Sequence, residues 1–149
     1  MPIERIIAKT IILRDFMFLH HLTENEKKAF LTLAKEFILV DGALDQEEEN
    51  LVRIMKAEMN IEEGYPEGQI SRQELLKMFE SRRSQMTAVI EMQGLGYANM
   101  EYHLQEKEFV QEMAESFGIS NEELSDIDDW VVRQVALLYE ANEFWKETV

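Results

Sequence analysis

Residues Val40 to Glu48 read VDGALDQEE, and this short acidic stretch separates two segments whose apolar residues have helical spacing. Gly42 is the residue type that most readily adopts the left-handed conformation ending a helix. Asp45 is a favoured N-cap residue, and Glu48 follows it at capping-box spacing. We therefore expect one helix to end and the next to begin within this stretch.

Similar helix-start signals recur along the chain, and between them apolar residues occur every three or four positions. Further cap pairs are Thr23 with Glu26, Ser71 with Glu74, and Ser120 with Glu123. The expected helices span about 4–20, 23–40, 45–59, 71–82, 84–97, 104–117 and 126–145, with a short helical turn at 120–124. No segment shows the two-residue alternation of a strand. The pattern predicts an all-α fold, a compact bundle of about seven helices.

The two halves of the chain resemble each other when one is aligned on the other. A single shift aligns Asp41 with Asn99 and Glu48 with Glu106, and it keeps the apolar positions of the following helices in phase. A joint at 60–70, rich in glycine and proline, lies between them. We interpret residues 1–149 as a single domain with two pseudo-symmetric helix–turn–helix halves, about 23–61 and 84–119. The alternative is chance agreement between two amphipathic helices.

The charge of the chain limits its partners. The sequence has 30 acidic and 15 basic residues, a formal net charge of −15, and no cysteine. A phosphate backbone is repelled by such a surface, so we expect no nucleic-acid partner. Disulfides and thiolate chemistry are excluded. The apolar N-terminus is interrupted by five charged residues, which argues against a signal sequence or membrane span and favours a cytoplasmic protein.

Glu48 is the unusual member of the acidic turn, because it begins the otherwise apolar face of its expected helix, and Glu106 repeats the arrangement. A carboxylate that enters a core must be hydrogen-bonded, paired or metal-bound. Three interpretations stay open: a helix cap, a site for calcium, magnesium or manganese, and a contact for a basic partner. The candidate metal ligands are Asp41, Asp45, Glu48, Glu101 and Glu106. The stretch matches only half of an EF-hand signature, because the first two ligands would fall on Phe37 and Leu39, and this argues against an EF-hand.

The Asp41-Gly42 helix end, the acidic turn, the Glu48 helix start and a degenerate second copy at 99–106 resemble the TerB-like (tellurite-resistance protein B) family. The resemblance covers about residues 23–145. It implies a bundle of about seven helices in two halves, a role in bacterial stress or tellurite resistance, and metal binding through the motif acids. The second copy keeps Glu101 and Glu106 but has Asn99-Met100 where the family favours Asp-Gly.

The resulting hypothesis is a non-enzymatic TerB-like module that binds a divalent cation or a basic partner through its acidic turns. The alternative is a structural adaptor or homo-oligomeric interaction domain in which the acids only cap helices. The sequence contains neither a Glu-x-x-His pair, as in di-iron enzymes, nor a glycine-rich phosphate loop, so no motif indicates an enzyme. Trp130 and Trp145 are expected to be core anchors or one side of an oligomer contact.

Overall fold

The computed structural model describes residues 17–39, 45–98 and 102–146, and within these ranges every regular element is a helix. The elements are η1 (Leu19–His21), α2 (Glu24–Ile38), α3 (Gln46–Met59), α4 (Arg72–Leu76), α5 (Arg82–Ala98), α6 (Leu104–Ser116) and α7 (Asn121–Phe144). The all-α prediction is confirmed. The helix predicted at about 4–20 lies almost wholly outside the described residues, so the expected number of seven stays a prediction.

Side chains cap the helices where their spacing predicts. At α2, the Glu26 side chain accepts the Thr23 N–H at 2.9 Å, while the Thr23 hydroxyl accepts the Glu26 N–H at 3.3 Å. Ser120 and Glu123 make the same reciprocal pair at α7. These bonds satisfy N–H groups that have no partner within the first helical turn. The capping residues therefore fix where these helices begin.

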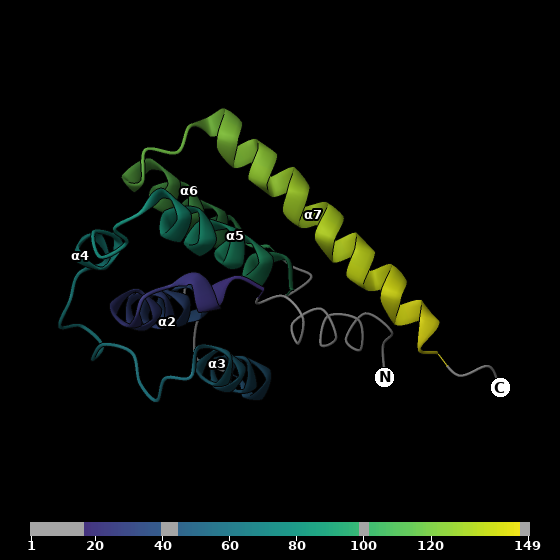
Figure 1. The fold of residues 1–149 in the computed structure, drawn as a ribbon, viewed down its shortest axis with the longest axis horizontal. Helices are drawn as coiled ribbons and strands as arrows, with labels where there is room; N and C mark the ends of the chain where they lie inside the picture. Colours follow the sequence, from purple (N-terminus) through teal and green to yellow (C-terminus); the bar gives the residue numbers. More distant parts are fainter. Residues whose placement is uncertain (1–16, 40–44, 99–101, 147–149) are drawn as a thin grey trace.

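Helix α5 occupies the centre of the bundle and packs against α6, α7, η1 and α2. Helix α2 lies between α3 and α5 (Figure 1). Helix α7 runs along the side of α5 that faces away from α2. Among the described residues, no helix is long and apolar enough to cross a bilayer.

A continuous apolar core joins the two helix pairs α2–α3 and α5–α6. The ring of Phe37 meets the ring of Phe109 edge-on at 5.6 Å, and Phe79 meets Phe117 in the same way. Such edge-to-face pairs stabilise a core beyond the area they bury. The described helices are thus parts of one hydrophobic core.

The helix pairs share one register along the chain. The separation in sequence between the first residues of α2 and α5 equals that between the first residues of α3 and α6. Helices α3 and α6 are followed by left-handed residues at equivalent positions, Asn60 with φ 54° and Gly118 with φ 69°. The backbone N–H of the next residue, Ile61 or Ile119, closes the same hydrogen bond onto each helix end. The buried positions that the sequence places in phase are also buried in both helices.

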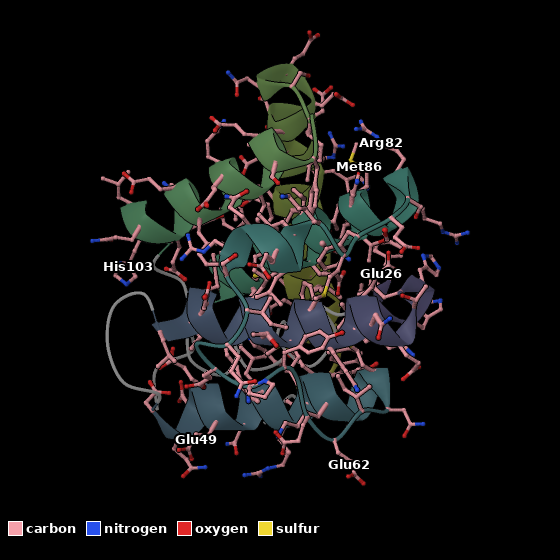
Figure 2. The ribbon with its side chains drawn as sticks, turned by 90° about the vertical axis from the view of Figure 1, so that its left-hand side faces the viewer. Glu26, Glu49, Glu62, Arg82, Met86 and His103 are labelled. Atoms are coloured by element: carbon pink, nitrogen blue, oxygen red, sulfur yellow. The ribbon has the colours of Figure 1, made fainter. Side chains whose placement is uncertain are left out.

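Helix α4 is shorter than the predicted segment 71–82, because the chain leaves the helix after Leu76. The second carboxylate oxygen of Glu26 accepts the N–H of Glu80 at 3.0 Å, and the Ser81 hydroxyl accepts the N–H of Ser84 at 3.0 Å. Figure 2 shows Glu26, at the start of α2, facing the first turn of α5. The chain therefore turns where the bond between Glu26 and the Glu80 N–H forms, although the apolar pattern of the sequence predicts that the helix continues.

Helix α7 also differs from its prediction, because residues 120–124 and 126–145 form one continuous helix from Asn121. Its buried residues are Ile127 and Val131. Trp130 is 37% exposed and Trp145 is 54% exposed, so the interpretation of these residues as core anchors is wrong. Figure 1 shows the second half of α7 running past the end of α5, which leaves Trp145 at the surface.

Arg72 connects elements from both helix pairs. Its guanidinium donates to Glu36 of α2 at 3.0 Å and to Glu112 of α6 at 2.6 Å, and it lies over the Phe109 ring at 4.0 Å. Burial alone would lower the pKa of Arg72, but its bonds to the two carboxylates raise it. Planar guanidinium groups suit such combined ion pairing and stacking. Arg72 therefore holds the two helix pairs together at their polar edge.

Candidate functional site

The acidic turn before α3 is built as a capping box. The N–H of Glu48 donates to the Asp45 carboxylate at 2.8 Å, and the Glu48 carboxylate accepts the N–H of Asp45 at 3.1 Å. Asp45 is exposed and Glu48 is partly buried. The capping interpretation is therefore confirmed for this pair, and the two carboxylates lie at the same helix N-terminus, where the helix dipole favours negative charge.

Glu106 makes the equivalent bond at the start of α6, accepting the N–H of His103 at 3.1 Å. It differs in burial, because only 3% of Glu106 is exposed. Figure 2 places His103 at the start of α6, on a different layer from Glu49 in the first turn of α3. His103 is a helix-start residue, as its position in the sequence suggests.

The predicted metal ligands are described only in part. Asp41 and Glu101 lie outside the described residues. Within the described ranges, no group of three or more histidine, aspartate and glutamate side chains is arranged to hold a metal ion. The five-residue metal site therefore stays a prediction, with Asp45, Glu48 and Glu106 placed as helix-capping acids.

A second polar feature is a cleft of about 510 Å³ between α5, α6 and α7. Its wall combines two tyrosines, amide side chains, one lysine and two carboxylates. The residues that carry its chemistry are Gln93, Tyr97, Tyr102, Lys107, Glu115 and Asp128. Three helices that belong to one rigid core thus present converging polar groups.

Hydrogen bonds fix the orientation of the polar groups in this cleft. The Tyr97 hydroxyl donates to an Asp128 carboxylate oxygen at 2.5 Å, and the Gln93 amide nitrogen donates to the same oxygen at 3.2 Å. The Gln93 amide oxygen accepts from the Tyr102 hydroxyl. The chain of bonds leaves Asp128 as the anionic acceptor at its end, held by donors from α5.

Glycine positions one of the two tyrosines. A Cβ added at Gly96 would lie 2.7 Å from Cζ of Tyr102, so only glycine leaves room for that ring against α5. Tyr102 then meets Tyr97 edge-on, with ring centroids 4.9 Å apart. Gly96 therefore lets the ring of Tyr102, which precedes α6 in the chain, approach α5 closely.

The tyrosine hydroxyls of the cleft are hydrogen-bond donors at neutral pH. Burial, followed by the hydrogen bond and charge of Asp128, raises the pKa of Tyr97 to about 12. Burial raises the pKa of Tyr102 far above its ordinary value, with added repulsion from Tyr97 and Glu106. Neither phenol is therefore activated as a base or nucleophile, and both suit positioning and binding.

The cleft also contains a cation of its own. The Lys107 ammonium lies over the Tyr102 ring, 5.5 Å from its centroid. An ammonium over an aromatic face is attracted by the ring quadrupole. The cleft thus combines the carboxylates of Asp128 and Glu115 with an ammonium that already lies on an aromatic face.

The sequence analysis did not identify Gln93, Tyr97 or Asp128 as site residues. A weak signal existed, since Gln93 and Tyr97 are four residues apart on one helix and therefore share a face. Nothing in the sequence places Asp128 of α7 opposite them, because that contact depends on how α7 packs on α5.

Comparisons with known proteins identify no relative: no family model, no curated protein and no solved structure matches this chain.

Proposed function

We propose that this protein is a non-enzymatic helical binding module that takes a basic segment of a partner protein in the cleft between α5, α6 and α7. The observation that carries the proposal is the Asp128 carboxylate, which Tyr97 and Gln93 hold in place by donating hydrogen bonds to it. A charged acceptor held in advance loses little freedom when a lysine or arginine binds.

The overall charge supports the same partner class. A net charge of −15 steers basic chains toward the protein and repels acidic ones. General attraction does not select a site, however, so the proposal depends on the geometry of Asp128 and the tyrosines. The protonated state of Tyr97 favours binding over acid–base chemistry at neutral pH.

A fluorescein-labelled lysine–glycine repeat peptide tests this proposal by anisotropy titration. We expect Asp128→Asn to weaken binding by about tenfold or more, as the loss of a charge-assisted hydrogen bond does. The matched control is Asp126→Asn, which removes the same charge from an exposed position of α7. Equal affinities of the two variants would show that the acidic surface binds the peptide without using the cleft, and would overturn the proposal.

A second candidate function is divalent-cation binding at the acidic turns, in the manner that the TerB-like resemblance implies. It is favoured by the presence of two carboxylates, Asp45 and Glu48, at one helix start, where each accepts the backbone N–H of the other residue. The shared register of α2–α3 and α5–α6 supports the duplicated architecture of that family. The stress or tellurite-resistance role belongs to this candidate.

Thermal unfolding of EDTA-treated protein, with and without calcium, magnesium or manganese, tests the second candidate. A cation that binds the native state raises the midpoint in proportion to the logarithm of its concentration. We expect the rise to be lost in Glu48→Gln and retained in Glu47→Gln, an exposed neighbour in the same turn. Unchanged midpoints with every cation would leave the acids as helix caps in an adaptor protein.

A further inference from the structure

The exposed side of α7 carries large apolar side chains in a line. Trp130, Leu137 and Phe144 follow one another at heptad intervals and are 37%, 63% and 85% exposed. A heptad is almost two turns of a helix, so these side chains lie along one face. Figure 1 shows α7 along the edge of the bundle, with its second half extending past α5. This face is therefore accessible to a second molecule.

Two charged residues of opposite sign occupy the gaps in this line. Arg133 lies between Trp130 and Leu137, and Glu140 follows between Leu137 and Phe144. Both are exposed, and neither forms an ion pair with another described residue. Alternating steps of three and four residues join the five positions, which is the spacing of a helix seam that packs against a second helix. We call these five residues the α7 seam.

The α7 seam is complementary to its own reverse. From either end it presents an aromatic residue, a charged residue, the leucine, a residue of the opposite charge and an aromatic residue. Two copies of α7, antiparallel about a two-fold axis at Leu137, bring that leucine onto its counterpart. Trp130 then faces Phe144 of the second copy, and Arg133 faces Glu140 of the second copy. A two-fold interface requires a surface that is self-complementary in this way.

The charges distinguish this arrangement from a parallel one. In a parallel pair each seam residue meets its own counterpart, so Arg133 would face Arg133 and Glu140 would face Glu140. Like charges at an interface cost free energy, whereas the antiparallel pair places each arginine opposite a glutamate. The planar guanidinium of arginine suits a carboxylate partner. The charges of the α7 seam therefore select an antiparallel second copy as its occupant.

The net charge sets the conditions under which two copies associate. Chains that each carry a charge of −15 repel one another. Asp129 and Glu143, which are exposed beside the two ends of the α7 seam, add to this repulsion. Salt screens the repulsion between exposed charges and leaves apolar contacts intact. We therefore expect the association to strengthen as the ionic strength rises.

We propose that this protein forms a two-fold symmetric homodimer through the α7 seam, with the two copies of α7 antiparallel and Leu137 at the axis. No residue of the α7 seam lines the cleft between α5, α6 and α7, so the inference goes beyond the proposed function and does not depend on it.

Sedimentation equilibrium of the full chain measures the association. We expect a reversible monomer–dimer equilibrium that Leu137→Glu weakens about a hundredfold or more, because two leucines leave the interface and two carboxylates meet at the axis. Val132→Glu is the control, since Val132 is exposed on α7 but lies off the seam. Circular dichroism verifies that both variants remain helical. A monomeric parent, or a dimer that Leu137→Glu leaves unchanged, would overturn the proposal.

A charge reversal tests the pairing of Arg133 with Glu140. We expect Arg133→Glu to weaken the dimer about tenfold or more, and a second change, Glu140→Arg, to restore most of the affinity. Glu62→Arg is the control for the second change, because it returns the same net charge at an exposed position outside α7. Equal recovery with either arginine would show that the two residues do not meet across the interface, against the proposal.

Cysteine cross-linking tests the orientation, in a chain that contains no native cysteine. Leu137→Cys places two thiols at the axis, where their Cα atoms can lie within the roughly 7 Å that a disulfide needs. Phe144→Cys is the control, because its two copies would lie about 21 Å apart along antiparallel helices. Under mild oxidation we expect Leu137→Cys to form cross-linked dimers about tenfold faster. Equal rates would exclude the antiparallel arrangement.

Discussion

Helices α3 and α6 begin with the same capping bond, but they place it in different surroundings. Glu48 and Glu106 each accept the N–H of the residue three positions earlier, at 3.1 Å. Glu48 is partly exposed, whereas 3% of Glu106 is exposed. The local motif sets where a helix starts, and the packing around it decides whether the acid is accessible to a ligand.

The two helices also differ in the residues that precede them. Tyr102 stands before α6, and its ring fills the space over Gly96 and adjoins the polar cleft. Asp45 stands before α3 and is exposed to solvent. The second helix pair therefore combines its cap with a cleft, while the first keeps its acids at the surface.

The largest expected difference concerns the core positions that correspond in the two helices. Phe109 and Leu51 are each 2% exposed. We expect Phe109→Ala to lower the free energy of unfolding by about 3–5 kcal/mol, and Leu51→Ala by about 2–4 kcal/mol. Phe109 costs more because it also contacts Phe37 and lies under Arg72. Urea unfolding followed by circular dichroism measures both, and equal losses would argue against the special role of the Phe109 ring.

A smaller effect is expected from the capping acids themselves. Glu106→Ala should lower the free energy of unfolding by about 1–3 kcal/mol, because it removes a buried acceptor and leaves a cavity. Glu48→Ala should lower it by about 0.5–1 kcal/mol, because water can replace the lost acceptor. The same urea experiment ranks the two. The reverse order would mean that the acidic turn before α3 is held by contacts beyond its cap.

Glu26 of α2 and Ser84 of α5 also occupy equivalent positions in the two helix pairs. At this position we expect the free energy of unfolding to depend on pH. Burial raises the pKa of Glu26, but hydrogen bonds from Thr23, Ser84 and the Glu80 N–H outweigh it, so the pKa is lowered overall. The stabilisation is therefore present above the ordinary glutamate pKa and is lost as the pH falls through the lowered value.

The variant Glu26→Gln isolates this contribution. We expect it to cost about 1 kcal/mol at pH 7 and less as the pH falls, since the parent loses its charge-assisted bonds in acid. Glu24→Gln is the control, because Glu24 is exposed at the start of the same helix. A constant difference between parent and Glu26→Gln from pH 7 to pH 3 would contradict the lowered pKa.

The smallest effect is expected at one of the two left-handed residues that follow α3 and α6. Gly118→Ala should cost about 1 kcal/mol, because an alanine side chain clashes with its own backbone at φ 69°. Asn60→Gly should change the stability by less than about 0.5 kcal/mol, since asparagine tolerates this conformation. Thermal unfolding resolves the first change. A cost for Asn60→Gly as large as for Gly118→Ala would indicate an additional contact of the Asn60 side chain.

Much of the fold could be predicted from the sequence, because it is set by local interactions. The capping pairs Thr23–Glu26, Asp45–Glu48 and Ser120–Glu123 lie at helix starts in the structure. The end of α4 could not be predicted, because it depends on the bond from the Glu80 N–H to Glu26, which lies far away in the sequence.

The site was less predictable for the same reason. The acids of the turn before α3 are neighbours in sequence, so their pairing is visible in a local motif. The cleft depends on Tyr97 meeting Asp128 across two helices, which no spacing rule reveals. The exposure of Trp130 likewise depends on how α7 packs on the rest of the molecule, and an apolar stripe on α7 alone does not contain that information.

The connection between the helix pairs bears on how the chain folds. The Thr32 hydroxyl accepts the N–H of Tyr65 at 2.9 Å, and the neighbouring Gly64 lies so close to α2 that a Cβ would be 2.6 Å from that hydroxyl oxygen.

This contact attaches the connection to α2 near its midpoint. The closure entropy of a loop grows with its length, so α4 docks after a shorter search than the full connection would require. One threonine side chain therefore shortens the loop that must close between α3 and α4.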